Sequence, residues 1–464
     1  MLNILVAAYF LLFLFLAWKN FRLAVILFII FLPTYLIRFE VFHFKNLIFP
    51  STVLELSFGA LFLVWLIKYS RQDFRNIWAV SQKHKLLFIA FDLFFLASVT
   101  SIFVSDMPIP SFGEWRAFFL EPMILFLILI GRCRSHENGN PDNRPLDSRF
   151  GGNDKLSSLD LICGLILSTL GISVYSIIQK FTGWGIATPE WAGEATRRVT
   201  AFFSSPNAVG LYVAPVLMLT VVVIASEVKR SVAIPPNNGK LSLMGLLRRP
   251  AVTGLLAMTI LATLAVVFTK SQGAWIGLAV GTLVFLFFVG YKKIAAVAAV
   301  LGVIFSLLIP SMRQAILFQD QANQNRLRLW GYTQTFLIKS PQNFILGAGV
   351  RQFFRKVQKP YYDKMVMERL IYPHNIFLNF WTEIGLLGML AIITILGYAF
   401  YLSYKIIKSD KILGAGLMGA LSVLVAHGLV DVPYFKNDLA FLFWIIIALP
   451  FYVENIRQSQ ASVI

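Results

Sequence analysis

Residues 374–403, HNIFLNFWTEIGLLGMLAIITILGYAFYLS, decide the fold class of this chain. After its polar start, the stretch is apolar for more than the roughly 20 residues that an α-helix needs to cross a bilayer. Within it, Glu383 is the one residue with a full charge. Soluble domains rarely contain an apolar run of this length. We therefore expect a membrane-spanning helix here, with its first residues outside the bilayer.

Runs of the same kind recur along all 464 residues, of which 58% are hydrophobic and 14% charged. We read the following runs as spans: 2–18, 21–38, 50–67, 86–104, 116–131, 159–180, 206–226, 251–269, 272–290, 294–309, 374–403, 412–430 and 438–453. The sequence thus predicts an all-α, polytopic transmembrane helical bundle of about 12 or 13 spans. We expect a single integral membrane domain, 1–464.

The distribution of Lys and Arg predicts the orientation of these spans. Most basic residues of the short loops fall in one set of alternate loops, which should be cytoplasmic. This set includes residues 132–158 and 227–250, whose Asn, Gly, Asp and Pro content predicts disordered, inserted loops. The opposite set includes residues 181–205 and the long segment 310–373. We therefore expect a multi-pass membrane protein with both latter loops on the outer side. In a Gram-negative cell this is the bacterial inner (cytoplasmic) membrane, and the outer side is the periplasm.

Charge and cysteine content limit the partners. The formal net charge is +18, which on a soluble protein would suggest nucleic acid. Here much of the charge lies in loops that orient the chain, so we expect membrane lipids and no nucleic acid as partners. The two cysteines, Cys133 and Cys163, form neither a disulfide framework nor a metal-ligand pattern. We expect no metal site, and the oligomeric state stays open.

Segment 310–373 is strongly basic, although long loops are exempt from the rule that orients spans. Arginine binds phosphate through paired hydrogen bonds, so the charge suggests an anionic ligand. A solvated face or one that binds lipid head groups is the alternative. We expect a helix from Arg326 to Lys339 with Leu327, Trp330 and Leu337 turned inward, ended by helix-breaking residues from Pro341 onward.

His374 follows Pro373 at the mouth of the helix that opened this section. A histidine can be a neutral base near pH 7, although a lone histidine at an interface is more often structural. Glu383 lies deeper, where a carboxylate is costly unless it is paired or faces a cavity. A further set of polar residues, for which we assign no role, is expected to cluster near the outer ends of spans 86–104 and 116–131: Asp92, Glu114, Arg116 and Glu121.

Five elements, taken in order, resemble the signature of the O-antigen ligase superfamily, which includes O-antigen polymerases and bacterial protein O-oligosaccharyltransferases. They are Arg198 to Gly210 with Pro206-Asn207, Thr269 to Trp275, Arg326 to Gly349 with Trp330 and Pro341, His374-Asn375 with Gly385 and Gly388, and His427 to Asp431. The resemblance covers roughly residues 160–450. Gln272 departs from it, because an Arg is usual there, and this puts in doubt a phosphate contact at that position.

The resemblance implies a membrane enzyme that moves a glycan from undecaprenyl pyrophosphate to an acceptor hydroxyl, on lipid A-core or a similar lipid or glycan. It implies no metal and no soluble cofactor. On it, His374 is the catalytic base, and Arg198 and Arg326, with Arg328 behind them, hold the pyrophosphate. Asn207, Asn375 and Glu383 are supporting residues.

Structural roles remain open for some of these residues. Asn207 could cap a helix after Pro206 rather than contact substrate. Glu383 could pair inside the bundle, and Asp431 could be purely structural.

Two other functions stay open. An O-antigen polymerase would use the same donor, with a lipid-linked glycan as acceptor. A flippase or transporter of lipid-linked glycans belongs to another class, and its substrate site would lie near the bilayer midplane. The ionisable residues of this chain gather instead near the predicted outer interface.

Overall fold

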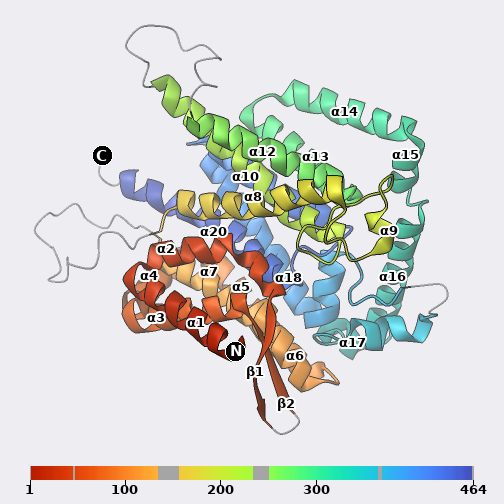
Figure 1. Ribbon diagram of the computed structural model, residues 1–464, viewed down its shortest axis with the longest axis horizontal. Helices are drawn as coiled ribbons and strands as arrows, with labels where there is room; N and C mark the ends of the chain where they lie inside the picture. Colours follow the sequence, from red (N-terminus) through yellow and green to blue (C-terminus); the bar gives the residue numbers. More distant parts are fainter. Residues whose placement is uncertain (1, 45–46, 134–155, 234–249, 364–367, 462–464) are drawn as a thin grey trace, which may run out of the picture. The chain divides into compact units, whose positions relative to one another are not determined.

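The computed structural model describes residues 2–44, 47–133, 156–233, 250–363 and 368–461 (Figure 1). Over these residues the structure is mainly helical, with irregular connecting segments and one two-stranded sheet. The predicted all-α, polytopic transmembrane class is therefore confirmed. The chain divides into two compact units, each described by itself below. That they form a single integral membrane domain stays a prediction.

Unit 1 comprises Met1–Lys83, Glu121–Thr269 and Phe441–Ile464. Its elements are α1 (Leu2–Lys19), α2 (Phe21–Ile30), η1 (Leu32–Leu36), β1 (Arg38–Phe44), β2 (Leu47–Thr52), α3 (Val53–Lys68), α4 (Ser70–Lys83), α7 (Glu121–Gly131), α8 (Ser158–Thr182), α9 (Pro189–Ala192), α10 (Pro206–Ala233), α12 (Pro250–Thr269) and most of α20 (Asn437–Ala461). The strands pair antiparallel, with a bulge between Glu40 and Phe42. This hairpin occupies the segment 38–50, for which the sequence predicted only a loop.

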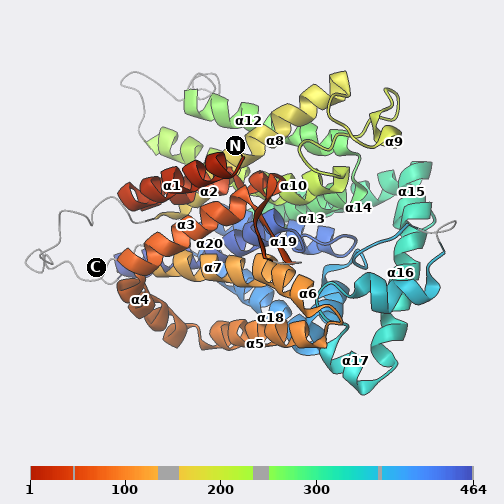
Figure 2. The same cartoon turned by 60° about the horizontal axis from the view of Figure 1, so that its bottom comes forward.

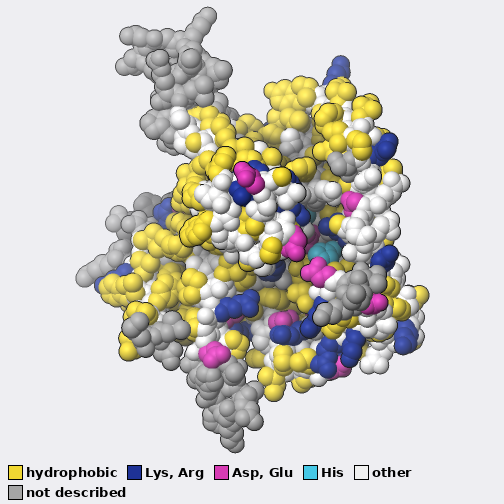
Figure 3. Space-filling view, turned by 45° about the vertical axis from the view of Figure 1, so that its right-hand side comes forward, with side chains coloured by type: hydrophobic (Ala, Val, Ile, Leu, Met, Phe, Trp, Pro, Cys, Tyr) yellow, Lys and Arg dark blue, Asp and Glu magenta, His cyan; other side chains and the backbone are white. Residues whose placement is uncertain are grey.

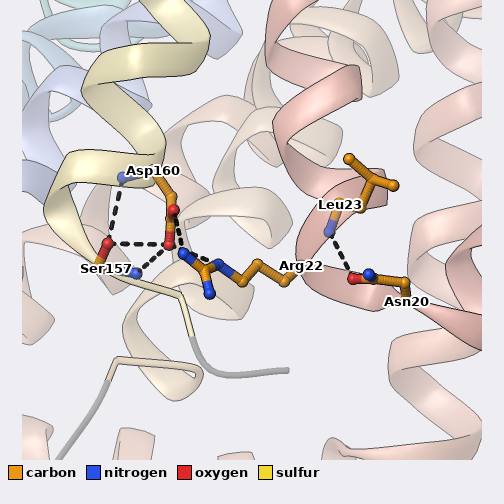
Figure 4. Close-up of polar contacts among 5 residues, drawn as sticks. All are labelled: Asn20, Arg22, Leu23, Ser157 and Asp160. Atoms are coloured by element: carbon orange, nitrogen blue, oxygen red, sulfur yellow. Dashed lines mark hydrogen bonds and ion pairs between the residues drawn. The ribbon is translucent and has the colours of Figure 1, made fainter. Parts of the chain in front are cut away.

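An ion pair joins α2 to the start of α8 in unit 1 (Figure 4). Arg22 donates from Nε and Nη2 to the two carboxylate oxygens of Asp160, at 3.0 and 2.7 Å. Asp160 also accepts from the Ser157 backbone N–H at 2.9 Å, while the Ser157 hydroxyl accepts from the Asp160 N–H. This capping box satisfies backbone donors that the first turn of α8 would otherwise leave unpaired. One carboxylate therefore both starts α8 and fixes it to α2.

Unit 2 comprises His84–Leu120 and Lys270–Ala440. Its elements are α5 (Lys85–Val104), α6 (Pro108–Trp115), the π-helical turn η2 (Arg116–Leu120), α13 (Gln272–Val289), α14 (Lys292–Leu308), α15 (Pro310–Ile316), α16 (Gln321–Ile338), α17 (Pro341–Leu346), the π-helical turn η3 (Phe353–Gln358), η4 (Lys359–Tyr361), α18 (Ile376–Ile407) and α19 (Lys411–Gly428). α5 lies beside α18 (Figure 2). Segment 310–373 is partly helical, as predicted.

Glycines allow α13 and α19 to approach closely. A Cβ atom on Gly281 would lie 2.8 Å from the Gly419 carbonyl oxygen, and one on Gly273 would lie 2.7 Å from the His427 ring. Small residues at such positions let helix backbones meet in a membrane. The segment after α16 has its own small core of Leu329, Ala348, Phe353 and Val357.

Among the described residues, eight helices are long and apolar enough to cross a membrane, or up to ten if two bent pairs each count as one span. The eight are Lys85–Val104, Ser158–Thr182, Pro206–Ala225, Val252–Thr269, Gln272–Val289, Ile376–Ile407, Lys411–Gly428 and Asn437–Glu454. The bent pairs are Val53–Lys68 with Ser70–Lys83, at 91°, and Lys292–Leu308 with Met312–Ile338, at 108°. This is fewer than the 12 or 13 spans that we expected from runs of about 17 apolar residues or more.

One of the expected spans is wrong in its continuity. The predicted span 21–38 holds α2, which has 10 residues and ends before the 3-10 turn that contains Pro33. The predicted span 116–131 begins with a π-helical turn, and α7 then has 11 residues. The helix continues without a break from this turn to Gly131, and Pro122, which has no backbone N–H to donate, lies in the first turn of α7.

Two predicted disordered loops fall largely outside the described residues. Residues 134–155 and 234–249 are not described, so their disorder stays a prediction. α10 continues to Ala233, past the predicted start of the second loop at residue 227. That part of the prediction is wrong.

Candidate active site at the start of α18

The start of α18 fixes the position of His374. Asn375 is the N-cap residue: its side-chain oxygen accepts from the backbone N–H groups of Phe377 and Leu378 at 3.1 and 3.0 Å. Its amide nitrogen donates to the Leu429 carbonyl at 3.0 Å, which ties α18 to the segment after α19. The predicted supporting residue Asn375 thus positions its neighbour through backbone contacts.

His374 has a left-handed backbone, with φ of 53°. Such a conformation is costly for a residue other than glycine, on the order of 1–3 kcal/mol, and it persists only where surrounding contacts hold it. Those contacts include the Trp330 indole N–H, which donates to the Pro373 carbonyl at 2.9 Å, and the Tyr372 ring, packed edge-on 5.1 Å from the imidazole. The histidine is therefore held in a defined orientation.

Asp431 lies beside the imidazole. Its Oδ1 is 3.2 Å from His374 Nδ1, and the two side chains are 5% and 20% exposed. Burial alone would raise the pKa of Asp431, but the hydrogen bond from His374 and the nearby charges of His374, His427 and Arg326 hold that pKa well below its ordinary value. The carboxylate is therefore ionised and only accepts hydrogen bonds. Nδ1 must then be the donor, which leaves Nε2 as the ring atom able to take a proton.

Tyr372 does not compete for that proton. Burial, together with the negative charge of Asp431, raises the pKa of Tyr372 above its ordinary value. Its hydroxyl stays protonated at any physiological pH. Among the described residues, no three His, Cys, Asp or Glu side chains are arranged to hold a metal ion.

Arg326 reaches the same region from α16. Its Nη1 donates to the Asn323 side-chain oxygen at 2.6 Å, and its charge contributes to the low pKa of Asp431. The Nε of Arg326 is buried and has no hydrogen-bond partner among the described residues. A buried donor without a partner costs about 1–3 kcal/mol, which an anionic ligand would recover. The structure therefore brings Arg326 together with His374 and Asp431.

The predicted helix from Arg326 to Lys339 forms, within α16, but not all of its inward residues are as expected. Leu337 is buried and Trp330 is half-buried, whereas Leu327 is 41% exposed. Leu329 takes the inner position instead. Arg328 lies on the exposed side of α16, away from the buried Nε of Arg326.

Glu383 joins the long segment to α18. It is 4% exposed, and its carboxylate accepts from the Arg351 backbone N–H at 2.7 Å. One residue earlier, the Thr382 carbonyl accepts from the Ala348 N–H at 2.6 Å. These bonds take up polar groups next to Gly385, where α18 breaks with a φ of 78°. Glu383 thus organises the loop rather than facing the imidazole.

Basic and acidic side chains gather on the face that carries α15 and α16, and a histidine side chain reaches the surface there (Figure 3). Within segment 310–373, Arg351 pairs with Glu114 at 2.9 Å and Lys356 pairs with Asp106 at 3.0 Å. The charge of segment 310–373 is thus partly used to hold the segment against residues 104–114.

Arg198 and Asn207 belong to unit 1. Arg198 Nε donates to the Thr269 carbonyl at 2.9 Å, and Nη2 donates to the Asn207 side-chain oxygen at 3.3 Å. Asn207 follows Pro206 in the first turn of α10. Asn207 thus orients Arg198, which neither of our two readings of this asparagine anticipated. Gln179 fixes the same loop by accepting from the N–H groups of Thr200 and Ala201, at 2.9 and 2.7 Å.

Sequence reasoning gave too little weight to Asp431. We interpreted it as structural because it lies at a helix end, yet it is the direct partner of His374. The sequence did contain a signal, because Asp431 is the last residue of the His427 to Asp431 motif. Hydrophobic patterns could not show that this element returns to the start of α18.

The fold and the site define an integral membrane protein of many helices, with a His–Asp pair where one long helix begins and an arginine, with a buried Nε, near it. The family model described as O-antigen ligase matches residues 257–393, which run from α12 into α18. This match supports a place for the chain in the O-antigen ligase and O-antigen polymerase superfamily, a group of membrane glycosyltransferase-like enzymes. No curated protein matches the chain.

Proposed function

We propose that the protein is a glycosyltransferase of the O-antigen ligase type, which moves a glycan from undecaprenyl pyrophosphate to an acceptor hydroxyl at the periplasmic face of the inner membrane. The observation that carries the proposal is the His374–Asp431 pair, 3.2 Å apart where α18 begins. Family membership supports the reaction class. Lipid-linked glycans and membrane lipids are the partners that this membership implies.

The chemistry follows from the geometry of the pair. The acceptor oxygen attacks the anomeric carbon while His374 Nε2 takes the hydroxyl proton, and Asp431 stabilises the imidazolium that forms. The bond from the anomeric carbon to the pyrophosphate oxygen breaks, and its electrons leave with undecaprenyl pyrophosphate. Attack opposite the leaving group inverts the anomeric centre.

Arginines offset the charge that develops on the leaving group. Arg326 is the first candidate, because its buried Nε lacks a protein partner among the described residues. Fixed cations of this kind typically contribute about 10²–10³ in rate. We further propose, from its motif alone, that Arg198 binds the pyrophosphate. Arg328, on the exposed side of α16, is a weaker candidate than the sequence suggested.

The test is glycan transfer by the purified protein in lipid nanodiscs, with an undecaprenyl-pyrophosphate glycan as donor. We expect His374→Ala to lower the rate by about 10²–10⁴, the usual contribution of a general base. Arg326→Ala should lower it as well, and Lys339→Ala, which changes an exposed cation beyond α16, should not. Full activity in His374→Ala would exclude the histidine as base.

The product distinguishes the alternatives. A glycan joined to the acceptor lipid indicates a ligase, and a lengthened carrier-linked glycan indicates an O-antigen polymerase. Movement of the donor across the bilayer without any transfer would contradict the proposal and indicate a flippase.

A further inference from the structure

Asp92 lies inside a membrane span, on its exposed side. The span is α5, Lys85–Val104, and Asp92 is exposed. It makes no hydrogen bond or ion pair with any described residue, in contrast to the polar cluster with Glu114 that we expected from the sequence. A carboxylate within a span normally faces the bundle interior or a partner. Asp92 faces neither the bundle interior nor a partner among the described residues.

Asp92 is too deep to reach the membrane surface. Seven residues separate it from Lys85 and twelve from Val104, which at 1.5 Å per residue is about 10 Å and 18 Å along the helix. Long Lys and Arg side chains can extend to the interface from such depths, but the short side chain of aspartate cannot. Lys85 is likewise about 10 Å away along the axis, beyond the reach of an ion pair.

The surface around Asp92 is an apolar stripe. Ile89, Leu96 and Phe103 fall on the same side of α5 by helical spacing, and they are 57%, 54% and 82% exposed. The opposite side of α5 packs against α18, where the Phe94 and Phe380 rings are 5.7 Å apart. The stripe is therefore a separate face with a single charged residue, and the hydroxyl of Thr100 on this side donates to the Ala97 carbonyl of its own helix.

Leaving that carboxylate in lipid is expensive. Aspartate is among the residues that insert least readily near the centre of a span. A cation at the same depth on a neighbouring helix would remove most of this cost, because the pair attracts strongly where the dielectric constant is low.

A second copy of this chain does not supply such a cation from its eight described spans. Their basic residues are Lys85, Lys180, Lys405 and Lys411, which lie at or near span ends. Two copies packed through α5 would also bring two Asp92 carboxylates together, and like charges repel. The repulsion between two Asp92 carboxylates, and the lack of a mid-span cation in these eight helices, favour a different protein as the partner.

We propose that the α5 stripe is the docking face for a transmembrane helix of another protein that carries Lys or Arg in the middle of its span, with Asp92 as its ionic partner. Charge complementarity within an apolar face specifies both the orientation and the identity of the partner helix. This proposal does not depend on the proposed glycosyl transfer.

The test uses a model helix of known chemistry: a labelled Leu/Ala transmembrane peptide with one central Lys. Association with the labelled, purified protein in phosphatidylcholine vesicles is measured by energy transfer. We expect the Lys peptide to bind at least about tenfold more tightly than its all-apolar counterpart, a difference of about 1.4 kcal/mol. Asp92→Leu and Asp92→Asn should remove that preference. Thr100→Leu, on the same side of α5, should keep it.

A charge exchange makes the test stricter. The Asp92→Lys variant should no longer prefer the Lys peptide, and it should instead prefer a peptide with a central Asp. Equal affinity for the Lys peptide and the all-apolar peptide would overturn the proposal. A preference for the Lys peptide that persists in Asp92→Leu and Asp92→Asn would overturn it too. Energy transfer between copies of the protein that disappears in Asp92→Asn would assign the stripe to self-association instead, and would equally overturn it.

Discussion

At the scale of single residues, the site depends on a histidine in a backbone conformation that it does not favour. His374 has a φ of 53°, and its ring is held between Tyr372 and Asp431. Strain of this kind persists where the surrounding structure fixes it, often at functional sites. The buried Arg326 Nε is a second local cost in the same region. Two costs at one place are what a binding site organised in advance for an anion would show.

Asp431→Asn should lower the rate of glycan transfer by about 10²–10⁴, as loss of the carboxylate does in other His–Asp pairs. An asparagine can donate to Nδ1, which would put the imidazole in the wrong tautomer, and it cannot stabilise the imidazolium. Transfer rates are measured at saturating donor, with membrane abundance as a check. Asp106→Asn, which changes an exposed partner of Lys356, is the control. Equal rates for the two variants would remove Asp431 from the mechanism.

At the scale of elements, the sequence predicted where the chain turns but not what the turns contact. Pro341, Gly347 and Gly349 were expected to break the helix that holds Arg326; α16 does end before them, at Ile338, but Pro341 begins α17 and Gly347 is the C-cap of α17. The sequence could not show that Gly347 lies against the carbonyl groups of Trp381 and Thr382 in α18. That contact joins residues far apart in sequence, and local propensity carries no information about it.

Gly347→Ala should destabilise unit 2. A Cβ atom there would lie 2.5 Å from the Trp381 and Thr382 carbonyl oxygens, and the φ of 71° disfavours any residue but glycine. Backbone cannot move aside cheaply, so we expect a loss of several kcal/mol. Thermal unfolding in detergent should show a lower Tm. Gly331→Ala, in α16 with open space around it, should leave Tm unchanged or raise it. A Tm for Gly347→Ala that matches Gly331→Ala would contradict the backbone contact.

The ion pair between Arg22 in α2 and Asp160 in α8 leads to a second prediction at the scale of elements. Arg22→Ala should destabilise unit 1 by about 1 kcal/mol, because Arg22 is partly exposed and its pair is screened by solvent. Asp160→Asn should cost more, since it also weakens the cap of α8. Arg22→Lys should restore only part of the loss, because an ammonium does not form the paired hydrogen bonds. Additive effects of Arg22→Ala and Asp160→Asn on Tm would show that the pair contributes nothing.

At the scale of the whole molecule, runs of apolar residues predicted the fold class because span length is fixed by bilayer thickness. The same rule overcounted spans, since it cannot see a break such as the one near Pro33. Motifs in the sequence were enough to predict the candidate base and the candidate arginine. The role of Asp431 as partner of His374 could be seen only from the three-dimensional path of the chain.

Deleting residues 135–155 should leave both insertion and transfer intact. The two ends of this segment already meet, because Cys133 and Leu156 form a β-bridge and both are buried. A short linker can therefore replace the segment without moving α7 or α8, and the entropic cost of closing a loop falls slightly as the loop shortens. Tm and the transfer rate should match the intact protein, whereas deleting 184–196, which includes α9 and precedes Arg198, should abolish transfer. A shortened protein that inserts and unfolds normally but cannot transfer glycan would show that the deleted loop takes part in function.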